Sequence, residues 1–251
     1  MVQPEGYSFG TNLVCKLEKA LYSLKQAPHA WFLKLKGILK GFGVTSTTFD
    51  PCLFVKYSSL SIIYLLTYVN DILVTGTAVS EVNKLIVDLN KVFTLKNSRK
   101  MSFFLDIEAE RSATGSLVLK LSKYVRDLLM RVDIVGARPM STPMMRSLKL
   151  DTSGAVFDNL SLYHSMVGGL QYVTITRLDI TFAVNKVSQF FHTPLEQYWK
   201  TVKHILRYLA RTIDMGLEFH KSKNFRILAF CDSDGIANPV DRKSHRDTMC
   251  F

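Results

Sequence analysis

Apolar residues recur at intervals of three and four in the segment 16–40, a spacing that predicts a helix. Pro28 interrupts this helix, because proline cannot donate a backbone hydrogen bond inside it. Three runs rich in β-branched and aromatic residues follow, a composition typical of strands, at 52–57, 61–69 and 72–75. Between the last two runs, the polar pair Asn70-Asp71 suits a hairpin turn. The first part of the chain is therefore expected to combine a helix with a sheet.

The middle of the chain alternates helical and extended patterns. Ser80 is placed to cap a helix with a regular apolar face, and Ser122 is placed to cap a second one. Two extended runs lie between these helices, at 102–108 and 117–121. From 136 to 159 the periodicity stops and glycine, proline, serine and aspartate accumulate. That interval is the best candidate for a boundary between subdomains.

Beyond residue 159 the pattern becomes helical. Three helices are predicted, at about 160–174, at about 179–191 and from 193 onward. The third start is the best marked, because Thr193, Pro194 and Glu196 supply an N-cap, a proline at the first helical position and the glutamate of a capping box. Two short extended runs follow, at 217–220 and 225–231. The sequence therefore predicts an α+β protein.

The charge of the chain indicates a polyanionic partner. Its 251 residues are 47% hydrophobic, which is enough for a buried core, and 32 Lys and Arg against 21 Asp and Glu give a formal net charge of +11. This balance favours nucleic acid over a membrane surface. Four cations recur at spacings of three and four in the third helix: Lys200, Lys203, Arg207 and Arg211. Such a stripe can follow a nucleic-acid backbone, or it can simply be the solvated face of a basic protein.

The cysteines and the apolar runs bear on the compartment of the protein. The four cysteines form no Cys-x-x-Cys pair and have no histidines at zinc spacing, which disfavours a zinc site or a disulfide framework. The first ten residues lack the apolar run of a signal peptide. The most apolar stretch, 60–69, is about half as long as a membrane span. We therefore expect an intracellular protein of the cytoplasm or nucleus, not secreted and without a membrane partner; its oligomeric state stays open.

At Tyr68-Val69-Asn70-Asp71 the chain resembles the Tyr-x-Asp-Asp hairpin of reverse transcriptases. The tetrapeptide alone is a weak signal. The chain resembles the reverse transcriptase of copia-type retrotransposon polyproteins through a series of segments in the family's order, at 17–32, 68–76, 103–108, 121–131, 141–144, 163–190, 204–217 and 231–244. Chance does not produce so many matching segments in one order.

The resemblance implies a hand-shaped polymerase followed by a ribonuclease H domain. It implies a partial palm (an antiparallel sheet with helices) and a thumb-like region at 1–135, and a linker at 136–159. A helical connection region would then occupy 160–220, and the truncated start of a ribonuclease H domain, an incomplete strand region, would occupy 221–251. The implied partner is nucleic acid, either an RNA template or an RNA–DNA hybrid.

The polymerase chemistry of the family needs carboxylates. Two Mg²⁺ ions about 3.5–4 Å apart are held by three aspartates, one upstream and two adjacent in the hairpin. The first seven residues resemble a stretch beyond the upstream aspartate, so that residue and the fingers are expected to precede Met1. In the hairpin, Asn70 replaces the first aspartate and leaves Asp71 as a remnant whose metal position is weak or vacant. Losing a unit charge beside a divalent ion costs on the order of several kcal/mol, so we expect no functional metal and no polymerisation.

The resemblance also assigns further residues. Lys25 and Gln26 match positions near the template or the incoming nucleotide, and Tyr68 either lines a former nucleotide site or is a packed aromatic. Asp232 matches the first metal-binding aspartate of ribonuclease H, although one acid cannot assemble a two-metal site. Asp106 replaces a family glycine, either as a sign of decay or as an exposed strand residue.

Three hypotheses follow for the function. The first is a truncated and inactive reverse transcriptase remnant. The second is a non-catalytic nucleic-acid-binding protein kept for its basic surface, and neutralising Lys203, Arg207 and Arg211 together would test it. The third, an active polymerase that takes fingers and an aspartate from a partner chain, has to operate despite Asn70 and is the weakest.

Overall fold

The computed structural model describes residues 24–221 and two strands, 229–233 and 246–250; residues 60, 70, 97–99, 135 and 146–153 are not described. The chain forms two compact units, Met1–Lys100 and Met101–Phe251. Both combine helices with antiparallel sheets, which confirms the predicted α+β class. No helix in the described part of the chain is long and apolar enough to cross a membrane.

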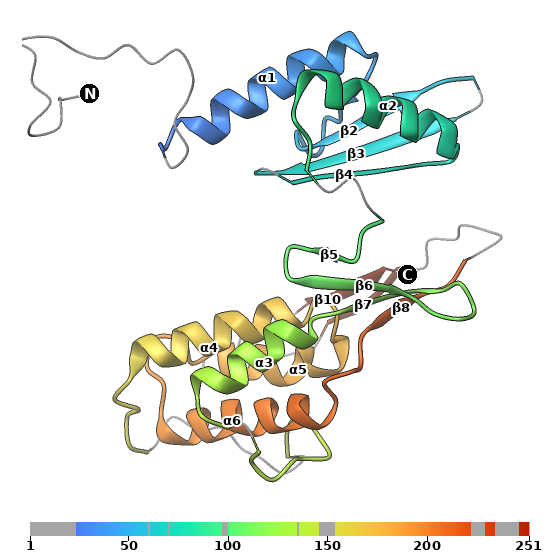
Figure 1. Cartoon of the computed structure of the whole chain (residues 1–251). Helices are drawn as coiled ribbons and strands as arrows, with labels where there is room; N and C mark the ends of the chain where they lie inside the picture. Colours follow the sequence, from blue (N-terminus) through green and yellow to red (C-terminus); the bar gives the residue numbers. More distant parts are fainter. Residues whose placement is uncertain are drawn as a thin grey trace, which may run out of the picture. The chain divides into compact units, whose positions relative to one another are not determined.

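The first unit is a four-stranded antiparallel sheet with two helices (Figure 1). The strands run in the order β1-β2-β3-β4. Their bounds are Thr45–Ser46, Leu53–Tyr57, Ile62–Tyr68 and Asp71–Gly76. Helix α1 spans Ala27–Gly41 and α2 spans Val79–Val92. Pro28 lies in the first turn of α1, where a missing donor costs nothing, so the helix begins at Ala27 rather than after the proline; residues 16–23 of the predicted helix lie outside the described residues.

Both helices cover the same face of this sheet (Figure 1). Leu39 of α1 and Leu89 of α2 pack with Ile63 and Leu65 of β3 in one buried cluster. Because side chains alternate along a strand, Tyr64 between those two residues points to the other face and is 41% exposed. The sheet therefore has one buried face and one open face.

The second unit contains another four-stranded antiparallel sheet, in the order β5-β6-β7-β8. The strands are Phe103–Phe104, Ile107–Arg111, Leu117–Lys120 and Leu217–Phe219. Strand β8 returns from far along the chain, and Gly216 precedes it because a Cβ there would lie 2.2 Å from the Leu119 carbonyl oxygen. This sheet thus pairs strands that precede and follow the helices of the unit.

The run 102–108, predicted as one strand, is a hairpin. Phe104 pairs with Ile107, and Leu105 and Asp106 between them have φ angles of 51° and 60°. Two residues with positive φ form the type I′ turn that joins tightly paired strands. Asp106 is therefore a turn residue rather than a strand residue, and its family counterpart, glycine, suits the same backbone.

Helices of the second unit pack around one buried core. They are α3 Ser122–Arg131, α4 Leu160–Val173, η1 Leu178–Ile180, α5 Thr181–Ser188 and α6 Glu196–Arg211. The core includes Leu128 of α3, Leu170 of α4, Val184 of α5 and Leu206 of α6, all fully buried. The helix predicted at 179–191 begins as the single turn η1 and ends at Ser188.

The predicted helix caps are wrong. Ala78, Leu121 and Leu195 occupy the N-cap positions, and none of them makes a side-chain cap hydrogen bond. At α6 the reason is tertiary: the Pro194 carbonyl accepts from the Phe157 N–H, and Leu195 forms a bridge with residue 156. These contacts draw the segment before α6 into a short extended pair.

The interval 136–159, predicted as a linker, contributes Ala137, Met144 and Phe157 to the edge of the helical core. Beyond α6, strands β9 (Ala229–Ser233) and β10 (Arg246–Cys250) form a separate antiparallel pair. The predicted domain bounds, which follow the family resemblance, remain predictions.

Candidate functional site: the hairpin of the first unit and the basic face of α6

Strands β3 and β4 meet in a tight hairpin. Tyr68 pairs with Asp71, so two residues join the strands, Val69 and Asn70, of which Asn70 lies outside the described residues. Val69 has a φ of 49°, which a β-branched side chain rarely adopts and which costs on the order of 1–3 kcal/mol. The expectation that Asp71 lies in the turn is corrected, because Asp71 is the first residue of β4.

The hairpin offers one carboxylate in its described part. Asp71 is exposed beside the turn, and no three His, Cys, Asp or Glu side chains gather to hold an ion anywhere in the residues that the structure describes. A pair of Mg²⁺ ions needs several anionic oxygens held together. The described residues of the hairpin therefore do not fit the two-metal centre of the family.

Tyrosines line the open face of the sheet, with Tyr68 at the hairpin and Tyr57 beside the other end of β3. Tyr57, Tyr64 and Tyr68 are 73%, 41% and 53% exposed. Tyr68 is thus not part of the core beneath the helices. The structure brings Tyr68 and Asp71 together in one hairpin, whereas Lys25 and Gln26 are exposed at the start of α1.

The predicted basic stripe lies on α6, where Lys200 and Arg211 are exposed and Lys203 and Arg207 are half-buried. The Lys203 ammonium lies 5.9 Å from the centre of the Trp199 ring. The Nε of Arg207 is buried and has no hydrogen-bond partner in the described part of the chain. The charged ends of these four side chains therefore lie mostly at the surface, while the aliphatic parts of Lys203 and Arg207 pack against the helix.

Sequence reasoning missed His204, which lies four residues after Lys200 and three before Arg207, on the same helix face. Its Nε2 contacts the carbonyl oxygen of Thr142 at 2.9 Å. We call Lys200, Lys203, His204, Arg207 and Arg211 the basic face of α6. The spacing would have revealed His204, but its contact with residue 142 is decided only by the tertiary structure.

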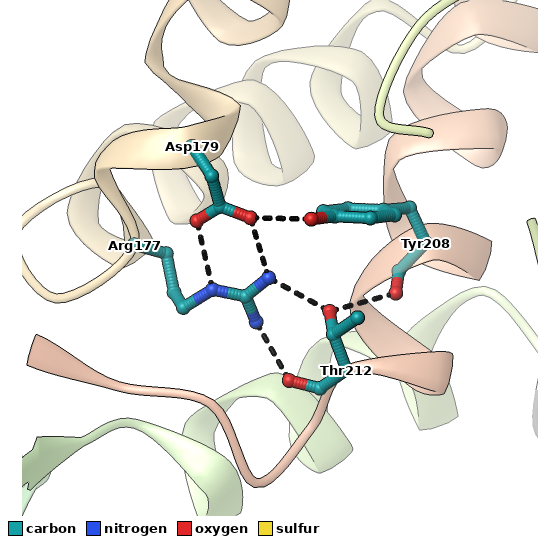
Figure 2. A network of polar contacts seen from close by, with 4 residues as sticks. All are labelled: Arg177, Asp179, Tyr208 and Thr212. Atoms are coloured by element: carbon teal, nitrogen blue, oxygen red, sulfur yellow. Dashed lines mark hydrogen bonds and ion pairs between the residues drawn. The ribbon is translucent and has the colours of Figure 1, made fainter. Parts of the chain in front are cut away.

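A polar network that sequence reasoning also missed fixes the C-terminal end of α6 (Figure 2). Arg177, 4% exposed, binds Asp179 through two hydrogen bonds of 2.9 and 2.7 Å. It also donates to the backbone and side-chain oxygens of Thr212, and the Tyr208 hydroxyl donates to Asp179 at 2.7 Å. Arg211 of the basic face lies between Tyr208 and Thr212 in the sequence. The network therefore fixes the end of α6 that carries Arg211.

The network shifts the ionisation of its members. Burial of Asp179 favours its neutral form, but the hydrogen bonds from Arg177 and Tyr208 outweigh burial and hold the pKa of the carboxyl below its ordinary value. The bond to Asp179, with burial, raises the pKa of the Tyr208 hydroxyl. Both shifts indicate a charged Asp179 that accepts from a neutral tyrosine.

Asp232 lies in β9, where the backbone register pairs it with Asp247 of β10. Residues 246–250 near the end of the chain supply the second strand of this pair. The side chains of both strands lie outside the described part of the structure.

A helix-backed antiparallel sheet whose β3–β4 hairpin carries a tyrosine and an aspartate, beside the Asn70 position, is the arrangement expected of a polymerase of the reverse transcriptase class. Residues 1–146 match the family described as reverse transcriptase (RNA-dependent DNA polymerase). The chain therefore belongs to the reverse transcriptase family.

Relatives of the chain are retrotransposon polyproteins and shorter proteins. The chain is 41% identical to the retrovirus-related Pol polyprotein from transposon RE1 of Arabidopsis thaliana over 96% of its own length and 17% of that protein. It is 36% identical to the polyprotein from transposon TNT 1-94 of Nicotiana tabacum, over 97% of its length and 19% of that protein. An uncharacterised mitochondrial protein of Arabidopsis thaliana is 39% identical over 72% of the chain and 75% of that protein.

These matches confirm the predicted resemblance to copia-type polyproteins. The chain spans less than a fifth of the length of the polyproteins. No solved structure matches the chain.

Proposed function

We propose that the chain is a reverse transcriptase segment that does not polymerise. The observation that carries this proposal is the hairpin, where Asn70 stands at the family's first aspartate and Asp71 is the remaining carboxylate. An asparagine offers a neutral carbonyl of nearly the same shape, so the hairpin keeps its form and loses a metal-binding charge. Because Asp71 is exposed, water and dissolved salt weaken the attraction between its carboxylate and a cation.

The family resemblance extends this proposal to the parts of the chain. The sheet β1–β4 with α1 and α2, together with the hairpin β5–β6, would be a portion of the palm, and β7 with α3 the thumb-like region. Helices α4 to α6 would be the connection, and the pair β9–β10 the start of ribonuclease H. The helix-backed sheet and the antiparallel pair support these assignments.

Metal binding by the hairpin tests the lost charge directly. One added negative charge about 4 Å from a divalent ion contributes about 2 kcal/mol in a water-like dielectric, which is about 30-fold in affinity. The variant Asn70→Asp should therefore bind Mn²⁺ about 30-fold more tightly than the unaltered chain, measured by paramagnetic broadening of hairpin amide signals. The control Thr75→Asp adds the same charge on the exposed side of β4, about 13 Å further along the strand.

Primer extension on an RNA template tests the activity itself. We expect no extension by the unaltered chain with Mg²⁺ or Mn²⁺. Extension that disappears in Asp71→Ala would refute the proposal, because the remaining carboxylate would then support catalysis with Asn70 beside it. If Asn70→Asp and the control Thr75→Asp bind Mn²⁺ equally tightly, the electrostatic argument for this proposal is wrong.

A second function, binding of an RNA–DNA hybrid without catalysis, is supported by the basic face of α6 and by the formal net charge of +11. Joint alanine substitution of Lys203, Arg207 and Arg211 should weaken binding. It should also reduce the steepness of the logarithmic salt dependence by about 0.9 for each phosphate that the variant no longer neutralises. Fluorescence anisotropy of a labelled hybrid at several salt concentrations measures both effects.

The matched control removes the same charge from another helix of the same unit. Lys123, Arg126 and Arg131 are exposed on α3, and their joint alanine substitution changes the net charge equally. If both triple variants lose affinity to the same extent, net charge alone drives binding and the basic face of α6 has no special role.

A further inference from the structure

The segment 137–145, which we call the strap, lies along the basic face of α6. The Thr142 carbonyl contacts His204 Nε2 at 2.9 Å, and the Met140 N–H donates to the Arg207 carbonyl at 3.5 Å. His204 and Arg207 belong to the same helix face. The strap therefore lies against the helix face that carries Lys203 and Arg207.

The surroundings of Thr142 make its hydroxyl accessible. Ser141 and Thr142 are exposed, and the strap contains no helix or strand. Pro143 follows directly and disfavours a helical backbone at Thr142, which lies in a bend outside any helix or strand. An exposed threonine that lies outside helices and strands and is followed by proline offers the chemistry that proline-directed serine/threonine kinases recognise.

The chain contains a second Thr-Pro pair with a different structure. Pro194 is buried and its carbonyl accepts from the Phe157 N–H at 2.9 Å. The next residue, Leu195, pairs with Val156, and the Glu196 N–H donates to the Ala155 carbonyl at 2.9 Å. Thr193 is itself exposed, so a kinase would have to open this pairing to bind Pro194 and the residues after it, and the two sites form a matched comparison within one chain.

A phosphate on Thr142 would meet a favourable electrostatic environment. It carries a charge of about −1.5 to −2 near neutral pH and three acceptor oxygens. Lys203 and Arg207 lie on the face of α6 that the strap contacts through His204, and Arg138 of the strap is exposed. Charge-assisted bonds between such cations and a phosphate are shorter and stronger than neutral ones.

We propose that Thr142 is a phosphoacceptor site for a proline-directed kinase and that its phosphate binds the basic face of α6 in competition with nucleic acid. The competition rests on the proposed binding of nucleic acid by this face; the modification and the docking of the phosphate do not. In the unmodified chain, the cations of the basic face of α6 can bind a polyanion. After phosphorylation, the phosphate on Thr142 neutralises these cations instead.

The modification is an ordinary phosphoryl transfer. The Thr142 Oγ1 forms a bond to the γ-phosphorus of a nucleoside triphosphate supplied with the kinase, and the bond from that phosphorus to the bridging oxygen breaks. The nucleoside diphosphate leaves, and the hydroxyl proton passes to the catalytic base of the kinase. The electron pair of the broken bond stays with the leaving diphosphate.

The site is tested by treating the full chain with a purified proline-directed kinase and ATP and mapping the product by mass spectrometry. We expect close to one phosphate per chain, lost in Thr142→Ala and unchanged in Thr193→Ala. Circular dichroism checks that both variants fold. No incorporation into the folded chain, or equal incorporation at Thr193, would overturn the assignment of the site.

Docking of the phosphate is tested by ³¹P titration. Cations beside the phosphate favour its dianion, so its second pKa should be lower in the chain than in a free phosphopeptide of residues 137–145. In the Lys203→Ala, Arg207→Ala double variant the value should return toward that of the peptide. The same value in the chain and in the peptide would overturn the docking.

Hybrid binding by the phosphorylated chain completes the test. We expect weaker binding and a shallower salt dependence than for the unmodified chain. If the unmodified chain does not bind the hybrid, the proposed nucleic-acid function fails while the ³¹P result still decides the docking. If it binds and phosphorylation changes nothing, the competition is wrong.

Discussion

Arg177 brings a full positive charge into the second unit with only 4% of its side chain exposed. Such a charge is tolerated because Asp179 accepts two hydrogen bonds from it and Thr212 accepts two more. The Tyr208 ring lies 5.5 Å from the guanidinium carbon, so the cation also meets an aromatic face. The stability of this region therefore depends on a charge pair whose members cannot be removed singly without cost.

Removal of the countercharge should be strongly destabilising. In Asp179→Asn, Arg177 stays buried without its anion, and we expect a loss of about 3 kcal/mol in the free energy of unfolding, measured in urea. Asp88→Asn is the control, because it breaks the exposed ion pair with Lys91 and should change stability little. Equal losses in both variants would contradict the importance of burial for the Arg177 pair.

The pH dependence of stability follows from the same carboxyl. The pKa of Asp179 is lower in the folded chain than its ordinary value of 3.8, so the folded state is favoured by ionised Asp179. This stabilisation is present above pH 3.8 and is lost as the pH falls through the lower folded-state pKa. Acid titration of stability should be steeper in that window for the unaltered chain than for Asp179→Asn. Identical acid profiles would show that the carboxyl is not stabilised by folding.

At the scale of elements, the β5–β6 hairpin depends on a contact from a helix. The Tyr172 hydroxyl of α4 donates to the carbonyl of Leu105, in the turn where two consecutive residues have positive φ. The Tyr172 ring also meets Tyr124 of α3 edge to face at 5.1 Å between ring centres. The helix thus holds a turn whose own residues, leucine and aspartate, carry a conformational cost.

Loss of that hydroxyl should loosen the hairpin. Tyr172→Phe keeps the ring and removes the donor, which should cost about 1 kcal/mol and speed amide hydrogen exchange in β5 and β6. Exchange in β3 and β4, which belong to the other unit, should stay unchanged. Tyr64→Phe, on the open face of the first sheet, is the control and should alter neither region. Unchanged exchange in the β5–β6 hairpin of Tyr172→Phe would mean that the turn is stable without the hydrogen bond from Tyr172.

At the scale of the whole molecule, each unit has a buried hydrophobic core of its own. The buried cluster of the first unit draws on residues between Leu35 and Leu89, and that of the second on residues between Val125 and Leu209. No described residue belongs to both clusters. Because burial of apolar surface is the main favourable term in folding, each unit holds the main source of its own stability.

The separated units should therefore fold. Fragments 1–100 and 101–251 should give circular dichroism spectra that add up to that of the full chain, and the second should unfold cooperatively with a midpoint close to that of the intact protein. A fragment 101–251 that is unfolded alone would contradict the closure of its core. Hybrid binding by this fragment, which contains the basic face of α6, would further locate the proposed second function.

Much of the secondary structure was predictable from local pattern. Strands 53–57, 62–68 and 71–76 follow runs of β-branched and aromatic residues, and α4 lies almost where its apolar spacing places it. The two-residue strand β1 and the hairpin at Leu105-Asp106 were missed, because pairing partners rather than propensity define them. The predicted cap of α6 failed for a similar reason, since contacts with residues 155–157 hold the segment before this helix.

The amino-acid order alone determined the family and the missing charge at Asn70, because both depend only on which residues stand in which succession. It also determined the stripe of cations on α6, because helical spacing is a local property. Only the tertiary structure decided that Thr142 lies against His204, that Arg177 closes a network with Thr212, and that β8 returns to β7. These contacts join residues tens of positions apart, and packing of the whole chain, rather than any local preference, selects them.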